Sequence, residues 1–415
     1  MRNWFAPLLA LLAPALAAQD ALSAWNTAAL DAIRALRTPP PAAARSLAIA
    51  HAAMHDAVNG IVGRYEQHLA QPTGTEGASA EAALAGAAHA SLAALFPSRA
   101  AQFALLRDSQ VELLPAGPAR DAGLAWGVAA ATQLLAARAA DGATGTASYP
   151  GSTAPGMWRP TVSFGGQVRP ALLPHWGTVA CFVLPAGSSL RPAAPPHLAS
   201  HRYAWEVRQV QALGAANSHH RTAEQTEVAQ FWAYGPGTAT PPGHWNEIAQ
   251  QVVPASRLDL CDRARVYALL NLAMADAAVV AWECKYVYGL WRPITAIQLA
   301  DQDGNPWTEP DASWTPLLPT PPFPEYVSGH SCFSAAAATV LARALGSDRI
   351  AFRVGSDDLP GVQRRYRRLS EAAWESGMSR IYGGIHFLSG NLEGLHAGQR
   401  TGTHVFDNAL RPLAQ

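Results

Sequence analysis

Small and apolar residues recur at helical spacing over most of the chain. Clear examples are the stretch 25–62, which the prolines at 39–41 divide in two, and the nearly uninterrupted stretch 262–290. The apolar and polar alternation that is typical of strands is scarce. The pattern therefore predicts an all-α fold of packed helices. The predicted helical segments are 25–62, 78–95, 117–140, 200–232, 244–253, 262–290, 366–382 and a helix that begins after Ser328.

Two long segments break this pattern. Residues 141–200 are rich in Gly, Pro, Ser and Trp, and residues 301–327 are rich in Pro and end in PPFPEYV. Long irregular segments of a compact domain are usually functional or wrap around its body. With 415 residues, 49% of them hydrophobic, the chain can form one large domain or two packed halves.

The charges of the chain cancel, because 30 Lys and Arg residues stand against 30 Asp and Glu residues. Nothing in this balance indicates nucleic acid, another polyanion or an acidic membrane surface as a partner. A binding site for an anion must therefore be local.

The first residues have the order of a signal peptide. Arg2 precedes an apolar run over 5–16, and the small-residue pattern ALA follows at 15–17. This predicts a signal peptide at 1–18 and a periplasmic or secreted protein. The run is shorter than the roughly 20 residues that cross a bilayer, and His, Asp or Arg interrupts the later alanine-rich stretches. We therefore expect no integral membrane span.

Four cysteines, an even number in an exported chain, permit two disulfides and leave their pairing open. No pair of these cysteines has the spacing of a zinc site. The four are Cys181, Cys261, Cys284 and Cys332.

Two basic residues end the most apolar stretch. Lys285 and Arg292 are seven positions apart, which is nearly two turns of a helix, so one continuous helix would present both on the same face. Two neighbouring cations repel each other unless an anion lies between them. A pair of surface cations on an amphipathic helix is the alternative, and for these two residues alone it would be favoured.

The sequence Ser328-Gly329-His330 opens a predicted helix. A helix N-terminus presents unpaired backbone N–H groups to an anion, and glycine allows close approach of the backbone. Ser328 suits the N-cap position, and the imidazole of His330 can take or give a proton near neutral pH.

A third group of candidate residues surrounds a double glycine. Arg380 and His386 are six positions apart and could not share a target on one helix. Gly383 and Gly384 lie between them and predict a turn that aims both side chains at one point.

The stretches KYVYGLWRP, PPFPEYVSGH and SRIYGGIH resemble the three site motifs of the vanadium-dependent haloperoxidases and of the type 2 phosphatidic acid phosphatase superfamily. Wider segments between about residues 25 and 405 look like the bacterial haloperoxidase branch. The resemblance implies two bundles shaped like four-helix bundles within 19–415, an N-terminal half 19–200 and a C-terminal half 201–415 that carries the site.

The resemblance also implies a role for each motif residue. The apical ligand of vanadate would be His386, and the acid/base that handles a proton of peroxide would be His330. Lys285 would in addition polarise the peroxide. The groups that would bind the vanadate oxygens are Lys285, Arg292, Arg380, Ser328 and the Gly329 amide.

In the reaction so implied, a halide attacks the activated hydrogen peroxide to give hypohalous acid, which halogenates a small organic substrate. Trp282 and Phe323 match aromatic positions that line the halide pocket of chloride-oxidising fungal members. The halide preference and a homo-oligomeric state stay open.

Two positions depart from the relatives. Superfamily phosphatases usually carry an Asp four residues after the motif-three His, where this chain has Gly390. Related fungal enzymes read FWAYD where this chain reads FWAYG, so Gly235 replaces an acid that partners the catalytic His. Both histidines would lack their orienting carboxylate.

Two other functions fit the same residues. An exported acid phosphatase would bind phosphate in this pocket, with His386 as nucleophile and His330 as the acid that protonates the leaving alcohol. The missing acid at Gly390 argues mildly against it. A non-catalytic oxyanion-binding protein is the third hypothesis, and the presence of His330 argues against it, because binding alone needs no proton carrier.

Overall fold

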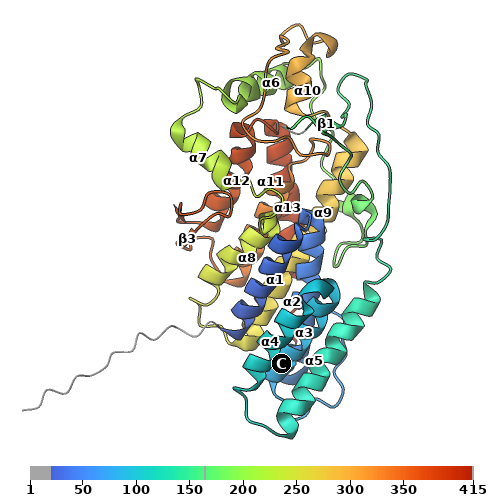
Figure 1. The fold of residues 1–415 in the computed structure, drawn as a ribbon, viewed down its shortest axis with the longest axis vertical. Helices are drawn as coiled ribbons and strands as arrows, with labels where there is room; N and C mark the ends of the chain where they lie inside the picture. The colour runs from blue at the N-terminus through green and yellow to red at the C-terminus, as the bar shows by residue number, and fades with distance from the viewer. Residues whose placement is uncertain (1–19, 163–164, 414–415) are drawn as a thin grey trace, which may run out of the picture.

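The computed structural model describes residues 20–162 and 165–413, and within them the fold is all-α, as predicted (Figure 1). The predicted signal peptide at 1–18 lies outside the described residues. The larger helices are α1 (Ala21–Leu36), α2 (Pro40–Val62), α3 (Ala80–Leu95), α4 (Ala100–Val111), α5 (Pro118–Ala137), α6 (His201–Gly214), α7 (Ala223–Phe231), α8 (Thr240–Val252), α9 (Leu260–Tyr288), α10 (Pro293–Gln298), α11 (Gly329–Ala344), α12 (Leu369–Tyr382) and α13 (Leu388–Asn408).

Two antiparallel pairs of very short strands complete the described structure, apart from isolated bridges and short 3-10 turns. β1 (Thr161–Val162) pairs with β2 (Val168–Arg169), and β3 (Phe352–Val354) pairs with β4 (Arg364–Tyr366). The predicted segment 366–382 is therefore helical only from Leu369. The predicted segment 200–232 is two helices, because the chain leaves the helix after Gly214 and resumes it at Ala223.

Helices α2, α3 and α5 form a bundle at one end of the elongated molecule (Figure 1). Small residues allow their backbones to approach closely. A Cβ added to Gly127 of α5 would lie 2.1 Å from the carbonyl oxygen of Ala83 on α3, and one on Gly86 would lie 2.6 Å from the carbonyl oxygen of Leu124. The alanine-rich sequence of this region is the reason for the tight packing.

Helix α9 runs through the middle of the molecule. The side chain of Asp259 caps its N-terminus, and α9 packs against α2 as well as against α11 and α13. Among the described helices, α9 alone is long and apolar enough to cross a membrane, but 94% of its most apolar 18-residue window is buried inside the protein. Its composition is thus explained by its place in the core.

The second bundle is formed by α11, α12 and α13, of which α11 and α13 pack against α9. A row of glycines on α13 faces α11. A Cβ on Gly398 would lie 2.2 Å from the carbonyl oxygen of Cys332, and one on Gly394 would lie 2.8 Å from that of Ser328. This contact brings the N-termini of α11 and α13 together.

The irregular segment 141–200 packs along α9. The carboxylate of Asp276 accepts hydrogen bonds from the backbone N–H groups of Phe182, Val183 and Leu184 at 2.6–2.9 Å. The four cysteines are free thiols, so the two disulfides that the even count permitted are not formed. Three of the four thiols are buried in the core.

Candidate functional site: a cluster of buried cations and histidines

The N-terminus of α11 forms the floor of the site. Ser328 is the N-cap, as predicted, and its Oγ accepts the N–H of Ser331 at 3.3 Å. The N–H of Ser328 donates to the carbonyl oxygen of Gly390 at 2.8 Å and ties α11 to α13. Gly329 and His330 are the first two helical residues, so the free amides and the dipole of α11 point into the site.

Lys285 lies one turn before the end of α9 and is fully buried. Its Nζ donates to the carbonyl oxygens of Pro324 and Glu325 at 3.3 and 3.1 Å and also to that of Val327. The C-terminal end of the segment 301–327 therefore lies around the ammonium group. The long Pro-rich stretch is a structural wall of the site.

The predicted common helix of Lys285 and Arg292 is wrong. Gly289 ends α9 in the left-handed conformation with φ +58°, and Arg292 is the N-cap residue of α10. Tertiary structure brings the two cations together instead. Lys285 Nζ lies 4.9 Å and Arg292 Cζ 4.8 Å from the centre of the Phe323 ring, so both contact the same aromatic side chain.

Arg292 connects three parts of the site. Its Nε donates to the carbonyl oxygen of Phe323 at 2.7 Å, and its Nη1 donates to that of Ile385 at 2.8 Å. Nη1 also lies 3.1 Å from Nε2 of His386. The remaining nitrogen, Nη2, is buried without a hydrogen-bond partner. A buried guanidinium N–H without an acceptor is costly unless a ligand supplies one.

The predicted turn between Arg380 and His386 is present. Gly384 has φ +77°, and the N–H groups of Gly384 and Ile385 donate to the carbonyl oxygens of Ile381 and Arg380 at 3.0 and 3.1 Å. These are the two hydrogen bonds of a Schellman motif at the end of α12. The motif leaves His386 in a short link before α13.

Arg380 is fixed by the C-terminal end of α7. Its Nη2 donates to the carbonyl oxygens of Trp232 and Ala229 at 2.6 and 3.3 Å, and its Nε donates to Ser379 Oγ at 2.8 Å. Carbonyl oxygens at a helix C-terminus favour a cation. The carbonyl of Trp232 also favours the protonated form of His330, so one element faces both residues.

A carboxylate comes close to the position where fungal relatives keep an acid. The N–H of Gly235 donates to Oδ2 of Asp358 at 3.0 Å. The charge of Asp358 partly offsets the burial that lowers the pKa of Arg380. Residue 235 itself carries no acid, but Asp358, on the segment between β3 and β4, places a carboxylate next to it.

Glu325 is the site residue that the sequence analysis missed. Its Oε1 lies 2.7 Å from Nδ1 of His386 and accepts the N–H of Phe387 at 3.0 Å, and its side chain is fully buried. His386 therefore has an orienting carboxylate, contrary to the expectation drawn from Gly390. The available signal was an acid within the apolar run PPFPEYV, directly before the anion-binding motif.

Burial and like charges keep the two imidazoles neutral. The pKa of His386 is lowered by burial and then by Arg292 and Lys285, and the pKa of His330 is lowered by burial and then by Arg380. Burial also lowers the pKa of Lys285 and raises that of Glu325, while the attraction between the two groups opposes both shifts. His386 can thus offer an unprotonated Nε2 to a ligand.

The two aromatic candidates border these groups. The rings of Trp282 and Phe323 are 5.1 Å apart, and a Cβ on Gly329 would lie 3.5 Å from the Trp282 ring. Trp282 Nε1 donates to the carbonyl oxygen of Leu172 at 3.2 Å, which anchors the ring to the irregular segment 141–200.

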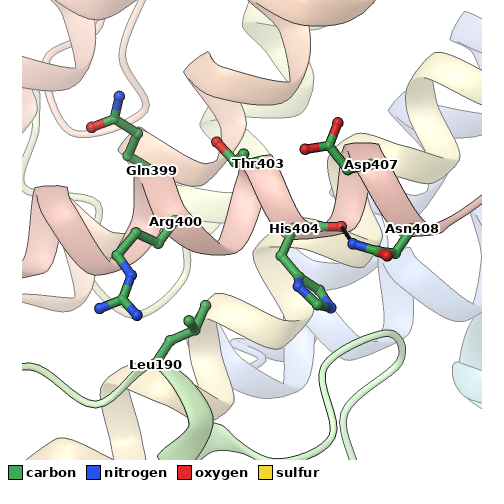
Figure 2. A pocket seen from close by; sticks show the side chains of 7 residues that line it. All are labelled: Leu190, Gln399, Arg400, Thr403, His404, Asp407 and Asn408. Atoms are coloured by element: carbon green, nitrogen blue, oxygen red, sulfur yellow. Dashed lines mark hydrogen bonds between the residues drawn. The ribbon is translucent and has the colours of Figure 1, made fainter.

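An open pocket on α13 is separate from this site. Figure 2 shows its lining side chains, which come from the C-terminal half of α13 and from Leu190. A second groove between α11, α12 and α13 has an apolar floor. Neither contains a residue of the anion site.

The site fits a tetrahedral oxyanion such as vanadate or phosphate. The site has three buried cations, Lys285, Arg292 and Arg380. The carboxylate of Glu325 lies near them and contacts Nδ1 of His386. Arg292 Nη2 and His330 Nε2 are buried nitrogens without a protein partner. A bound oxyanion would supply both charge and acceptors.

The chain is similar to vanadium haloperoxidases in both sequence and fold. Residues 265–415 match the family model for the second helical-bundle domain of vanadium chloroperoxidase. The vanadium chloroperoxidase of Curvularia inaequalis is 28% identical over a match that covers 47% of this chain and 42% of that protein. The chain thus matches less than half the length of this curated relative.

Solved structures agree over nearly the whole chain. A bacterial vanadium-dependent iodoperoxidase superposes with a TM-score of 0.82 and 27% identity, covering 95% of this chain and 97% of that chain. A holo-type bacterial vanadium-dependent chloroperoxidase shares the fold with a TM-score of 0.69 and 18% identity, over 89% of this chain and 92% of that chain. The chain is thus similar to vanadium-dependent haloperoxidases in the sequence of its second helical bundle and in its overall fold.

Proposed function

We propose that the chain binds vanadate and uses hydrogen peroxide to oxidise halide ions to hypohalous acid. The observation that carries the proposal is the group of three buried cations around His386, at a helix N-terminus, with Arg292 Nη2 and His330 Nε2 free of protein partners. Such a pocket is costly without an anion. Similarity to vanadium haloperoxidases supports vanadate as that anion.

Each residue has a defined part in this proposal. Lys285, Arg292 and Arg380 neutralise the oxyanion, and Ser328 and the Gly329 amide donate hydrogen bonds to it. The Nε2 atom of His386 is the protein ligand. When bound, vanadate would activate peroxide as a Lewis acid, and the oxidation state of vanadium would not change. His330 takes or gives a proton at Nε2.

Iodide is the halide that we propose first. The likeness to a bacterial iodoperoxidase over 97% of that chain supports it. The resemblance of Phe323 to the aromatic residue of chloride-oxidising members keeps chloride as a second substrate. The small organic acceptor is proposed only as a class, a nucleophilic carbon that reacts with hypohalous acid.

The test is a pair of assays on one preparation. Orthovanadate is added to the purified protein, and halogenation of monochlorodimedone is followed with peroxide and iodide, bromide or chloride. Hydrolysis of nitrophenyl phosphate is measured in parallel without vanadate. Halogenation that depends on vanadate supports the proposal, whereas phosphatase activity without any halogenation refutes it.

Phosphate ester hydrolysis is a second candidate, and one observation favours it. The carboxylate of Glu325 on Nδ1 of His386 provides the support that a nucleophilic Nε2 requires, so the absence of an acid at Gly390 no longer argues against a phosphohistidine. A protein that binds phosphate tightly and is inactive in both assays would instead be an oxyanion-binding protein.

We also propose that the chain is exported. The order of residues 1–18 supports a signal peptide. The test is the mass of the protein recovered from the periplasm or medium after expression of the full chain. A mass without the first 18 or so residues supports export, and an intact cytoplasmic product argues against it.

A further inference from the structure

The carboxylate of Glu325 and the backbone of Gly390 occupy one place in the site. A Cβ added to Gly390 would lie 2.4 Å from Oε1 and 2.7 Å from Oε2 of Glu325. A side chain at residue 390 is therefore incompatible with Glu325 in its present position. Glycine at this point of α13 makes room for the acid that contacts His386.

The distance between a Cβ on Gly390 and Oε1 of Glu325 also matches the geometry of an aspartate side chain. A separation of 2.4 Å is close to that between the Cβ of an aspartate and its own carboxylate oxygens, given standard bond lengths. An aspartate side chain introduced at residue 390 could thus place an oxygen where Oε1 of Glu325 lies. Residue 390 is the position of the acid in superfamily phosphatases, four residues after His386.

We propose that Glu325 is the positioning residue of His386, and that Glu325 together with Gly390 takes over the role that an aspartate at the position of Gly390 has in superfamily phosphatases. The proposal rests on the oxyanion site proposed above. By accepting a hydrogen bond from Nδ1–H, Glu325 favours the tautomer whose Nε2 is unprotonated, the atom that Arg292 Nη1 contacts at 3.1 Å and that would bind the oxyanion.

The charge of Glu325 is held by its surroundings. Its Oε1 accepts the N–H of Phe387, the N-cap residue of α13, so the positive end of that helix dipole faces the carboxylate. Arg292 and Lys285 also attract it. Hydrogen bonds from Phe387 and His386 thus hold Oε1 in place, whereas Oε2 is buried without a hydrogen-bond partner.

Three variants test the exchange: Glu325→Ala removes the acid, Gly390→Asp adds a second acid where there is no room, and the double variant moves the acid to residue 390. Glu325→Gln is the conservative control, because its amide oxygen can still accept from Nδ1. A single cooperative thermal transition is required of each variant before comparison.

The first readout is the tautomer of His386 in the ligand-free protein. It is measured by NMR on protein labelled with ¹⁵N at histidine, and the His386→Ala spectrum identifies the signal. We expect a proton on Nδ1 in the wild type, a mixture of tautomers in Glu325→Ala, and the Nδ1 form again in the double variant. This readout needs neither vanadate nor halide.

The second readout is the affinity for orthovanadate, by titration calorimetry. Loss of a residue that orients a ligand typically weakens binding by about 10- to 100-fold. We expect such a loss in Glu325→Ala, a smaller loss in Glu325→Gln, and recovery to within a few-fold of wild type in the double variant.

Two results would overturn the proposal. One is a Glu325→Ala protein that keeps the Nδ1 tautomer and the wild-type affinity. The other is a folded double variant no better than Glu325→Ala in either readout. If halogenation is absent altogether, the tautomer measurement still decides the role of Glu325, so failure of the proposed function remains distinguishable.

Discussion

The guanidinium of Arg292 lies 4.8 Å from the centre of the Phe323 ring, and its Nε donates to the Phe323 carbonyl oxygen at 2.7 Å. One residue thus holds the cation by both its ring and its backbone. The ring also contacts Lys285, so a residue expected to line a halide pocket also holds the two cations in place.

We therefore predict that Phe323→Leu weakens oxyanion binding. A buried cation–π contact contributes about 1–2 kcal/mol, so the Kd for orthovanadate should rise roughly 5- to 30-fold. Titration calorimetry measures it. Phe406→Leu is the matched control, since Phe406 contacts Arg343 and Arg265 away from the site. Equal affinities of the two variants would contradict the role given to Phe323.

The two histidines should separate in their effects. His386→Ala removes the proposed ligand, so vanadate should be lost on dialysis. His330→Ala should keep most of the binding and slow turnover by about 10²- to 10⁴-fold, because it removes a proton carrier. Vanadium content after dialysis and the halogenation rate measure the two effects. An equal loss of vanadium in both variants would refute this division.

The turn before His386 should tolerate no side chain. Gly384 has φ +77°, and a Cβ there would lie 2.4 Å from the carbonyl oxygen of Gly214. We expect Gly384→Ala to lower the free energy of unfolding by roughly 2–5 kcal/mol, from backbone strain plus overlap.

Gly361→Ala is the control for this prediction. Gly361 also has a positive φ, +87°, but a Cβ there meets no atom within 4 Å. Its cost should be strain alone, about 1 kcal/mol. Urea unfolding of both variants measures the difference. If the two variants lower the free energy of unfolding equally, the close approach of Gly214 and Gly384 does not contribute to the effect of Gly384→Ala.

Acid should unfold the protein through three buried histidines. Burial lowers the pKa of His51, His55 and His244 from 6.5 to about 3. The unfolded chain thus binds protons that the folded protein does not. The stability contributed by each neutral imidazole is complete above pH 6.5 and is lost as the pH falls from there toward 3.

The slope of stability with pH measures this effect. Each histidine adds up to about 1.4 kcal/mol per pH unit to the fall. Urea unfolding at pH values from about 4 to about 7 should show a shallower slope, by about one proton, for His244→Gln. His244 Nε2 contacts the Gly355 carbonyl oxygen, which the amide can also reach. Parallel slopes would show that His244 is protonated in the folded state.

Helical periodicity predicted the all-α class, the N-cap at Ser328 and the turn at Gly384, because these depend on local sequence. The common helix of Lys285 and Arg292 failed for a local reason as well, since Gly289 ends α9. The two cations are nevertheless close to each other, because both contact the ring of Phe323. This contact joins segments that are distant in the sequence, so helical periodicity cannot predict it.

Glu325 could not be deduced from spacing. Its role depends on the meeting of the segment 301–327 with the N-terminus of α13, and on the free space at Gly390. An absent acid at one position says nothing about an acid arriving from another part of the chain. The domain boundary near residue 200 and the roles of the site residues remain predictions.

Helix α9 belongs to both bundles, since it packs on α2 as well as on α11 and α13. The chain end adds a second link, because Pro412 forms a bridge with Tyr65 just after α2. We expect the two halves to melt together in one calorimetric transition. A fragment that begins within α9 would expose the surface that α2 covers, so the solubility of the C-terminal bundle depends on helices that contribute no residue to the candidate site.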